Sequence, residues 1–214
     1  MRDEPPTTEL LLAHAAAGDV AAWGALLTAH QERLARMVAF RMDTRLRGRI
    51  DAADVVQDAF VEASAHREDY FRAPTTPLFL WLRGVVSNKL LEVHRHHLGT
   101  HMRDAKRELP LGGPPMGGDT SAALCAHLTG HLTSPSLAAA RGEIRMRLAE
   151  GLDRMDPTDR EVLTLRHFEQ LTNAEAAQVV GIQERAAAKR YLRALERLKK
   201  ILSDLPGGLT ELRL

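Results

Sequence analysis

The stretch LTNAEAAQVVGIQERAAAKRYLRALERLKK, residues 171–200, has the pattern of two helices separated by a tight turn. Thr172 and Glu175 fit a capping box, in which each side chain accepts a hydrogen bond from the backbone N–H of the other residue. We therefore expect a helix to begin near Asn173 and to end at Gly181, because glycine adopts a left-handed conformation without steric cost. A basic second helix is expected from Arg185. This order predicts a helix-turn-helix.

The expected second helix separates apolar from basic side chains. Its apolar residues fall roughly along one stripe, which comprises Ala186, Leu192, Leu195, Leu198 and Leu202. The cations fall mainly on the other faces, at Arg185, Lys189, Arg190, Arg193 and Arg197. A helix with such a basic face suits the major groove of DNA.

Basic residues are concentrated in two stretches of the chain. Residues 182–202 hold seven Lys and Arg against two Glu, a net charge of +5, although the whole chain carries only +1. Residues 83–107 hold six Lys and Arg against one Glu and one Asp, a net charge of +4. Most Lys and Arg simply cover solvated surface. Segregation of this kind instead favours binding to a polyanion such as nucleic acid.

The composition predicts an all-α protein. The chain has 214 residues, of which 44% are hydrophobic and 4% are aromatic, and its many Ala, Leu and Arg favour helices over strands. No apolar run is long enough to cross a bilayer, and the N-terminus has no secretory signal, so we expect a cytoplasmic protein without membrane insertion. Cys125 is the single cysteine and receives no functional role.

Glycine and proline divide the chain into two predicted helical domains. Six Gly and Pro lie between residues 112 and 118, too many for a regular element to continue, so residues 108–134 are expected to form a flexible linker. Helical periodicity precedes the linker over residues 7–17, 19–42, 51–68 and 78–99, and follows it over residues 136–155 and 156–170. The predicted domains are residues 1–107 and 135–205, the second of which contains the helix-turn-helix.

The stretch DAADVVQDAFVEA, residues 51–63, combines an apolar stripe with an acidic face. The stripe comprises Val55, Val56, Ala59, Phe60 and Ala63. Asp51 and Asp54 are accounted for by their favourable position at a helix N-terminus. Gln57 has no such structural explanation. Trp81 lies among Leu and Val residues, which favours a core position over a platform for base stacking.

These motifs together resemble a known family. DAADVVQDAFVEA, then WLRGVVSNKLLEVHRHH, then the linker, then LDRMDPTDREVLTLRHFEQLTNAEAAQVVGI and a basic helix are similar to sigma-70 family RNA polymerase sigma factors of the extracytoplasmic-function (ECF) type. The resemblance covers nearly the whole chain outside the linker. It implies a bacterial factor that binds core RNA polymerase, recognises the −35 and −10 promoter elements and promotes DNA melting for transcription initiation.

The resemblance also assigns roles to particular residues. In such factors the first domain docks on the clamp helices of the polymerase β′ subunit, which here implies contacts by Asp54, Val55, Gln57, Asp58 and Phe60. The −10 element would be bound by Phe71, Arg72, Trp81, Asn88, Lys89, His94 and Arg95. The −35 element would be read by Arg185, Lys189, Arg190, Arg193 and Arg197. An anti-sigma factor is a further candidate partner, and no cofactor is implied.

Other functions fit the sequence less well. A helix-turn-helix regulator that binds duplex DNA without a sigma role stays the alternative, although no receiver-type strand pattern precedes residue 134. A metal site is a weak hypothesis, since His94, His96, His97 and His101 come without the Glu of an H-E-x-x-H frame or a Cys partner. No nucleophile triad or phosphate loop stands out, so the chain is not expected to be an enzyme.

Overall fold

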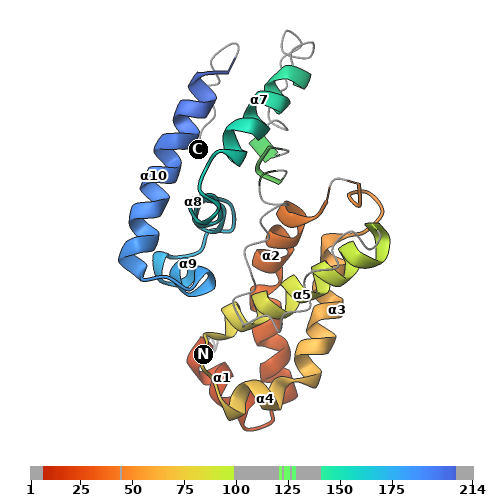
Figure 1. The fold of residues 1–214 in the computed structure, drawn as a ribbon. Helices are drawn as coiled ribbons and strands as arrows, with labels where there is room; N and C mark the ends of the chain where they lie inside the picture. Colours follow the sequence, from red (N-terminus) through yellow and green to blue (C-terminus); the bar gives the residue numbers. More distant parts are fainter. Residues whose placement is uncertain are drawn as a thin grey trace, which may run out of the picture.

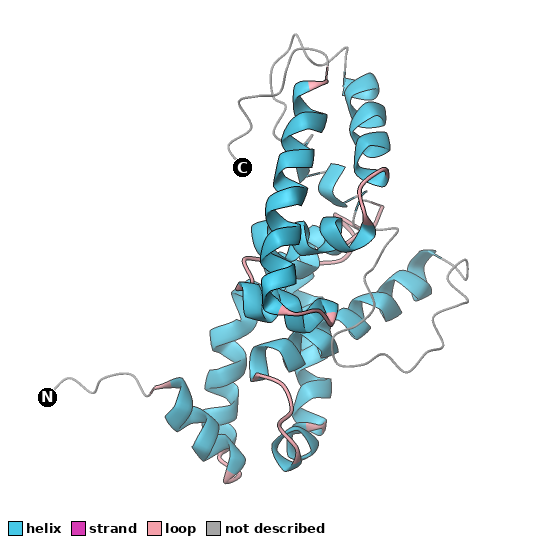
Figure 2. Ribbon diagram, turned by 60° about the vertical axis from the view of Figure 1, so that its left-hand side comes forward, coloured by secondary structure: helices cyan, strands magenta, loops and turns pink. Residues whose placement is uncertain are grey.

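The computed structural model describes residues 7–43, 45–98, 121, 123–125, 127–128 and 141–205. Within these ranges the regular elements are all helical, as predicted (Figures 1 and 2). The first half of the protein, residues 7–98, holds α1 Thr8–Ala16, α2 Val20–Arg41, α3 Ala52–Ala65, α4 Arg67–Arg72 and α5 Leu78–Leu98. The second half, residues 141–205, holds α7 Arg141–Asp153, α8 Pro157–Leu163, η2 Thr164–Phe168, α9 Asn173–Val180 and α10 Glu184–Ser203.

In the first half, α2 is the central helix, and α1, α3 and α5 pack around it. Aspartate caps fix where α2 and α3 begin: the Asp19 side chain accepts hydrogen bonds from the backbone of Ala21 and Ala22, and that of Asp51 accepts one from Ala53. Such caps contribute about 0.5–2 kcal/mol each. The predicted stripe of the third helix is confirmed, because all five of its residues are buried: Val55, Val56, Ala59, Phe60 and Ala63.

In the second half, α10 packs against α7, α8 and α9. The predicted capping box is present, with Thr172 and Glu175 each accepting a backbone hydrogen bond from the other, and Gly181 ends α9 in the left-handed conformation at φ 74°. α7 and α10 approach each other closely at Gly151, where an added Cβ would lie 2.7 Å from a side-chain carbon of Ile201. Glycine is therefore needed at this helix crossing.

The apolar stripe predicted for α10 is partly wrong. The residues that this helix buries are Ala187, Ala194, Leu198 and Leu202, while Leu192 is 62% exposed. These buried residues are spaced by 7, 4 and 4 positions, which places them on one face of the helix. Leu192 lies two residues before Ala194, which corresponds to a rotation of about 200° around the helix, and it therefore points away from the core.

Two further expectations about local structure need correction. The helix expected over residues 51–68 ends before His66. Residues 67–72 form a separate helix, α4. The predicted linker contains regular structure: its described residues, 121, 123–125 and 127–128, are helical. Leu124 and Leu128 are buried in the core of the second half. The rest of the linker and the start of the helix predicted from residue 136 lie outside the described residues.

The two halves share their cores. Phe40 from α2 packs in the core formed by α7, α8 and α10. In the other direction, four residues of the second half belong to the core of the first: Leu165, Leu171, Ala176 and Val179. The sequence did not predict this contact, because the halves were expected to be separate domains. None of the described helices is long and apolar enough to span a bilayer.

Candidate polymerase and nucleic-acid surfaces

The exposed face of α3 carries the polar residues predicted to bind polymerase. Asp54, Gln57 and Asp58 are exposed, and their spacing places them on one side of the helix. Val61, one further turn along, is 74% exposed. Val61 was not predicted from the sequence, although a Val that follows three polar positions at helical spacing is a usable signal. The result is an apolar residue at the edge of an acidic face, a combination suited to a protein partner.

Val55 and Phe60, for which the resemblance implies a polymerase contact, lie in the core of the first half. Both are buried, with 2% and 7% of their surfaces exposed. They are part of the apolar stripe that fixes α3 against α2 and α5, because an apolar stripe that faces the core is what holds a helix in place. In this structure they support the acidic face and do not offer a contact surface themselves.

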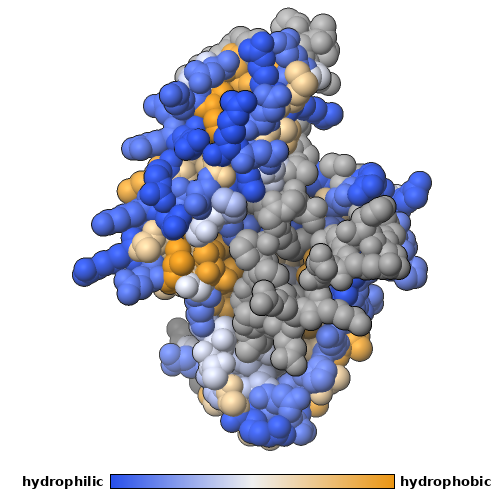
Figure 3. All heavy atoms as spheres, in the orientation of Figure 1, coloured by the Kyte–Doolittle hydropathy of each residue, from blue (hydrophilic) through white to orange (hydrophobic). Residues whose placement is uncertain are grey.

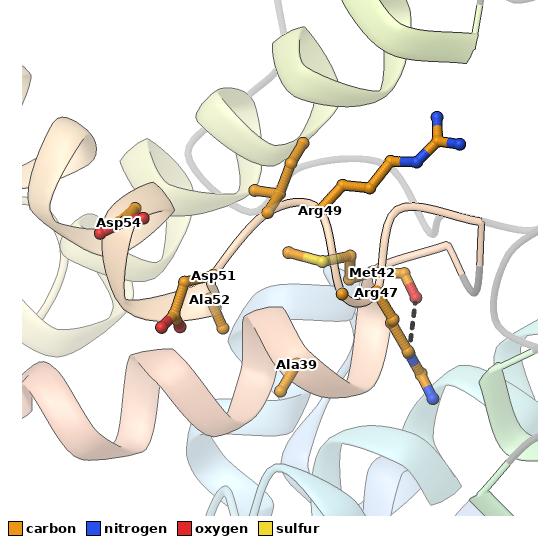
Figure 4. Close-up of a pocket in the computed structure, with 9 residues that line it drawn as sticks. Ala39, Met42, Arg47, Arg49, Asp51, Ala52 and Asp54 are labelled. Atoms are coloured by element: carbon orange, nitrogen blue, oxygen red, sulfur yellow. Dashed lines mark hydrogen bonds between the residues drawn. The ribbon is translucent and has the colours of Figure 1, made fainter.

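A cavity of about 730 Å³ adjoins the acidic face where α2 approaches the start of α3. It is lined by Ala39, Met42, Arg47, Gly48, Arg49, Ile50, Asp51, Ala52 and Asp54. Figure 4 shows that the Arg49 side chain extends away from Asp51 and Asp54, while Arg47 bonds to the carbonyl of Met42. Arg47 also donates to the carbonyl of Phe40. It therefore satisfies the free carbonyls at the end of α2.

A second cavity, of about 380 Å³, lies between α4 and the start of α5. Its lining combines an aromatic wall with polar groups: His66, Asp69, Tyr70, Ala73, Thr75, Thr76, Trp81 and Val85. The rings of Tyr70 and Trp81 lie 5.0 Å apart. The Tyr70 hydroxyl donates to the carbonyl of Thr76, and burial raises the pKa of this phenol. Stacking surfaces beside polar groups are what an unpaired base requires.

Of the aromatic residues predicted for the −10 element, Trp81 lines this cavity and Phe71 does not. Phe71 packs edge-on against Trp23, with 5.9 Å between ring centroids. Trp81 is only 9% exposed, which agrees with the core position favoured by its neighbours in sequence. Tyr70 also lines the cavity and was not predicted from the sequence. The sequence pattern that could have indicated Tyr70 is the aromatic pair Tyr70–Phe71, just before the prolines that follow α3. Because the two residues are adjacent, only one of them can face the cavity.

The remaining residues predicted for the −10 element lie around this cavity or along α5. Arg72 is exposed and pairs with the cavity residue Asp69 at 2.9 Å. Asn88 is exposed one turn after Val85, which lines the cavity, so the two share a helix face. Lys89 pairs with Glu92 at 3.3 Å.

Further along α5, Arg95 and His94 differ in accessibility. Arg95 is exposed, whereas His94 is 3% exposed. The His94 ring accepts a hydrogen bond from the backbone of Asp43, so His94 fixes the loop after α2 and cannot reach phosphate in this structure. No group of three metal-ligating side chains occurs within the described residues; His101 lies outside them.

The start of α10 presents the exposed part of the predicted −35 surface. Arg185 and Lys189 are exposed and lie one turn apart, and neither has an ion pair among the residues that the structure describes. Leu192 lies on the same side, one turn further on. Figure 3 shows that hydrophilic residues dominate the surface over α10. An exposed leucine between cations can contact a thymine methyl group in the major groove.

Arg190 and Arg193 are held by two aspartates at the start of α8; we call these four residues the α10 cluster. Arg190 bonds to Asp156 at 3.1 Å and to Asp159 at 2.6 Å. Arg193 bonds to Asp159 at 2.7 and 2.8 Å. Burial raises the pKa of Asp159, but the hydrogen bonds from Arg193 and Arg190 outweigh it and lower that pKa overall. Arg197 donates to the carbonyl of Arg154.

Part of the second half matches a known protein family. Residues 145–198, which include α8 to most of α10, match the family described as sigma-70, region 4. The chain is 27% identical to the RNA polymerase sigma factor NccH of Alcaligenes xylosoxydans xylosoxydans, over 94% of this chain and 97% of that protein. It is 29% identical to the RNA polymerase sigma factor CnrH of Cupriavidus metallidurans, over 90% of this chain and 93% of that protein.

A solved structure is also similar along most of the chain. It is that of CnrH in complex with the cytosolic domain of CnrY, and it has 27% sequence identity and a TM-score of 0.52 over 92% of this chain and 99% of that one. These names point to a regulatory protein and not to an enzyme. The chain is therefore similar to ECF-type sigma factors of the sigma-70 family along most of its length, which points to a role in transcription.

Proposed function

We propose that this protein binds core RNA polymerase, recognises the −35 and −10 promoter elements and promotes melting of the promoter. The observation that carries the proposal is the match of residues 145–198 to sigma-70, region 4. It coincides with a capped helix, a left-handed glycine turn and a helix whose first turns expose Arg185 and Lys189. The first half supplies the other two surfaces that this function needs. They are the acidic face of α3, for polymerase, and the cavity between α4 and α5, for a base of the −10 element.

The acidic face of α3 is the proposed contact with the clamp helices of the polymerase β′ subunit. Asp54, Gln57 and Asp58 would make polar contacts, Val61 would add an apolar one, and Val55 and Phe60 would hold the helix in position. Asp58→Arg should abolish binding to core polymerase, because a reversed charge adds repulsion to the lost attraction. Asp204→Arg, at the far end of α10, is the control. Unchanged binding of the Asp58 variant, measured by pull-down with normal circular dichroism, would contradict this assignment.

The cavity between α4 and α5 is the proposed site for an unstacked base of the −10 element. Tyr70 and Trp81 would provide the stacking surface, and Asn88 and Arg72 would contact the strand at its rim. The −10 surface would continue along α5 through Lys89 and Arg95, while Phe71 and His94 support it from the interior. Extrusion of a base costs a few kcal/mol, which these contacts must offset.

Promoter opening offers the decisive experiment, because a regulator that binds only duplex DNA never melts it. With core polymerase and a bound promoter, permanganate footprinting should detect unpaired thymines at the −10 element. Asn88→Ala should reduce the signal by about five- to hundredfold, equivalent to roughly 1–3 kcal/mol, and a pre-melted template should restore part of it. If wild-type protein with core polymerase never opens DNA, the chain is instead a duplex-binding regulator.

The −35 element is proposed to be read from α10. Arg185 and Lys189 would make the first contacts, and Arg190, Arg193 and Arg197 would follow where phosphate displaces their internal partners. Arg185→Ala should cost about 1–3 kcal/mol if it pairs with guanine, or lower the salt slope by about 0.9 if it contacts phosphate. Lys199→Ala, on the C-terminal half of the same helix, is the matched control in band-shift assays across salt concentrations.

A protein partner that restrains the factor is the last part of the proposal. The similar solved structure is of CnrH bound to the cytosolic domain of CnrY, and this supports an anti-sigma factor for the present chain. Isolation of the protein from its own cells under conditions of low activity should recover such a partner in about one-to-one amount.

A further inference from the structure

The loop between α2 and α3 carries three arginines within five residues, Arg45, Arg47 and Arg49. We call residues 43 and 45–49 the arginine loop. Arg47 bonds to the carbonyls at the end of α2. The side chain of Arg45 is 68% exposed. Arg49 is also exposed and has no ion pair among the residues that the structure describes.

Backbone hydrogen bonds give the arginine loop a defined shape. The N–H of Leu46 donates to the carbonyl of Asp43 at 2.9 Å, and the N–H of Arg49 donates to the carbonyl of Leu46 at 2.9 Å. Leu46 is 3% exposed and anchors the loop in the core of the first half. Groups on an anchored backbone lose less conformational freedom when they bind a partner. The loop therefore presents Arg45 and Arg49 from fixed positions.

The arginine loop is joined to the end of α5. The backbone N–H of Asp43 donates to the His94 ring at 3.2 Å, and Figure 1 shows the loop on the same side of the first half as the yellow-green end of α5. The Asp43 carboxylate accepts two hydrogen bonds from the Arg45 guanidinium, at 3.0 and 2.8 Å. Arg45 lowers the pKa of Asp43 to about 2. This carboxylate therefore stays charged at neutral pH and orients Arg45.

Positive charge dominates the arginine loop and the helix end beside it. The loop holds three Arg against one Asp, a net charge of +2. The last turn of α5 adds three exposed basic residues, Arg95, His96 and His97. The nearby Glu92 pairs with Lys89. Asp51 and Asp54 are close in sequence, but Arg49 extends away from both (Figure 4), so they do not neutralise it.

The charges on the two sides of the arginine loop call for different partners. A protein surface that is complementary to Asp54 and Asp58 on α3 is basic, and such a surface would repel Arg45 and Arg49. The partner of these two arginines should instead be an anion. Each guanidinium presents N–H donors in a planar fork that matches the oxygens of a phosphate group. Nucleic acid is the polyanion that the proposed function brings to α5.

The position of this nucleic acid follows from the course of the chain, and this step rests on the proposed function. The cavity for a base of the −10 element lies at the start of α5. The chain leaves the other end of α5 towards the second half, which would read the −35 element further upstream. The end of α5 and the arginine loop would therefore face DNA upstream of the −10 element, where the strands are still paired.

We propose that the arginine loop binds the phosphate backbone of duplex DNA just upstream of the −10 element, through Arg45 and Arg49. The loop extends the basic surface of α5 onto a second segment of the first half. It supplies the contact that His94 cannot make, because His94 is buried. Contacts of this kind position a protein on DNA without reading the sequence.

The salt dependence of DNA binding tests the arginine loop without polymerase. The probe is a 30-base-pair duplex without promoter sequence, titrated with the full chain between 50 and 200 mM salt. Each phosphate contact adds about 0.9 to the slope of log affinity against log salt concentration. The double variant Arg45→Gln, Arg49→Gln should therefore have a slope lower by about 1.8. Over this range, wild-type affinity should fall about 12-fold more than that of the variant.

A matched control removes two exposed arginines elsewhere. Arg36→Gln, Arg147→Gln changes the net charge equally, at two side chains that are each 51% exposed and lie outside the proposed binding surfaces. Its slope should equal that of wild type. If the loop variant has the slope of this control, with normal circular dichroism in both, the arginine loop does not bind phosphate and the proposal is overturned.

Two promoter fragments place the contact. One has a single-stranded −10 element with duplex DNA upstream of it, and the other lacks the upstream duplex. With core polymerase, the loop variant should bind the first fragment about tenfold or more weakly than wild type and the second as tightly as wild type. An equal loss on both fragments would overturn this placement.

Core polymerase binding separates the remaining outcomes. Pull-down of core polymerase by the loop variant should equal that by wild type. Loss of this binding, with an unchanged salt slope on DNA, would show that the arginines contact polymerase and would overturn the proposal. If the wild-type protein with core polymerase binds neither fragment, the proposed function fails. The salt slopes of the free chain then still decide whether the arginine loop binds phosphate.

Discussion

The same chemistry occurs in different surroundings in the α10 cluster and in the buried cluster, which consists of Arg41, Arg83, Glu161 and Glu169 where the two halves of the protein meet. Each consists of two arginines and two carboxylates with ion pairs of 2.5–3.1 Å. In the buried cluster the arginines Arg41 and Arg83 are 4% and 7% exposed, whereas in the α10 cluster Arg190 and Arg193 are 30% and 60% exposed. Only the second pair of arginines can exchange its partners for phosphate without disrupting a core.

The chemical groups in the two clusters are the same, so they do not distinguish a structural role from a binding role. The exposure of the arginines does. In the α10 cluster the Asp159 side chain is only 8% exposed, but water reaches both of its arginine partners. It screens these pairs and leaves them worth about 1 kcal/mol or less. A buried charge that loses its partner costs several kcal/mol. The two clusters should therefore respond very differently to the same kind of substitution, and the following experiments measure that difference.

The largest effect is expected for Arg41→Met, which leaves Glu161 and Glu169 short of a partner inside the interface. We expect the free energy of unfolding of the protein to fall by about 3–5 kcal/mol, measured by urea denaturation and circular dichroism. Arg36→Met, on the same helix but paired with the exposed Glu32, should cost less than about 0.5 kcal/mol. Equal losses in the two variants would show that burial does not distinguish the clusters.

Acid should weaken the buried cluster next most strongly. The pKa of Glu169 in the folded protein, about 2, lies below its ordinary value of 4.5. Its contribution to stability is therefore complete above about pH 4.5 and is lost as the pH falls towards 2. The shift corresponds to about 3 kcal/mol. The stability difference between wild type and Glu169→Gln, from urea titrations at several pH values, should shrink over that window; a constant difference would contradict it.

Arg33→Met tests a pair of intermediate exposure at the rim of the same interface. The side chains of Arg33 and Glu175 are 26% and 22% exposed, so we expect a loss of about 1 kcal/mol, between the buried and the solvated pairs. The Arg33 guanidinium also lies 3.7 Å from the centre of the Phe79 ring, and Met can retain part of this contact. Arg33→Lys, which keeps the charge, should recover part of the loss in the same denaturation assay.

The smallest effect on stability is expected for Asp159→Asn, at no more than about 1 kcal/mol. Its effect on DNA binding should be visible, because a carboxylate that competes with phosphate for Arg190 and Arg193 is neutralised. We expect binding of duplex DNA to strengthen and its salt slope to steepen by up to about 0.9 for each arginine released. Asp204→Asn changes the net charge equally at an exposed site. Weaker binding by Asp159→Asn would mean that Asp159 orients the two arginines for DNA.

Local features of the fold were predictable from the sequence because their causes are local. Caps at Asp19, Asp51 and Thr172, the turn at Gly181 and the stripe of α3 all depend on residues within a turn of one another. The exposed members of the candidate site, such as Asn88 and Arg185, also follow from helical spacing together with the resemblance to sigma factors.

Contacts between distant residues were not predictable. Arg83 was counted with the basic stretch that begins at residue 83, yet its partner Glu169 is 86 residues away. Nothing in the neighbourhood of either residue distinguishes a buried ion from a solvated one. Tyr70 was missed for a similar reason, because the choice between it and Phe71 depends on how α4 packs against Trp23 and α5. The helical segment in the linker was hidden by the Gly and Pro residues that precede it.

Phe40 shows how far the two halves depend on each other. It is carried by α2 but completes the core around α7, α8 and α10, while Leu165 and Leu171 complete the core of the other half. A chimaera that exchanges one half with a relative would therefore bring together interior surfaces of unmatched shape. Modular exchange should succeed only when these positions, together with Arg41, Arg83, Glu161 and Glu169, are transferred as one unit. The same condition would make the two halves evolve as a pair.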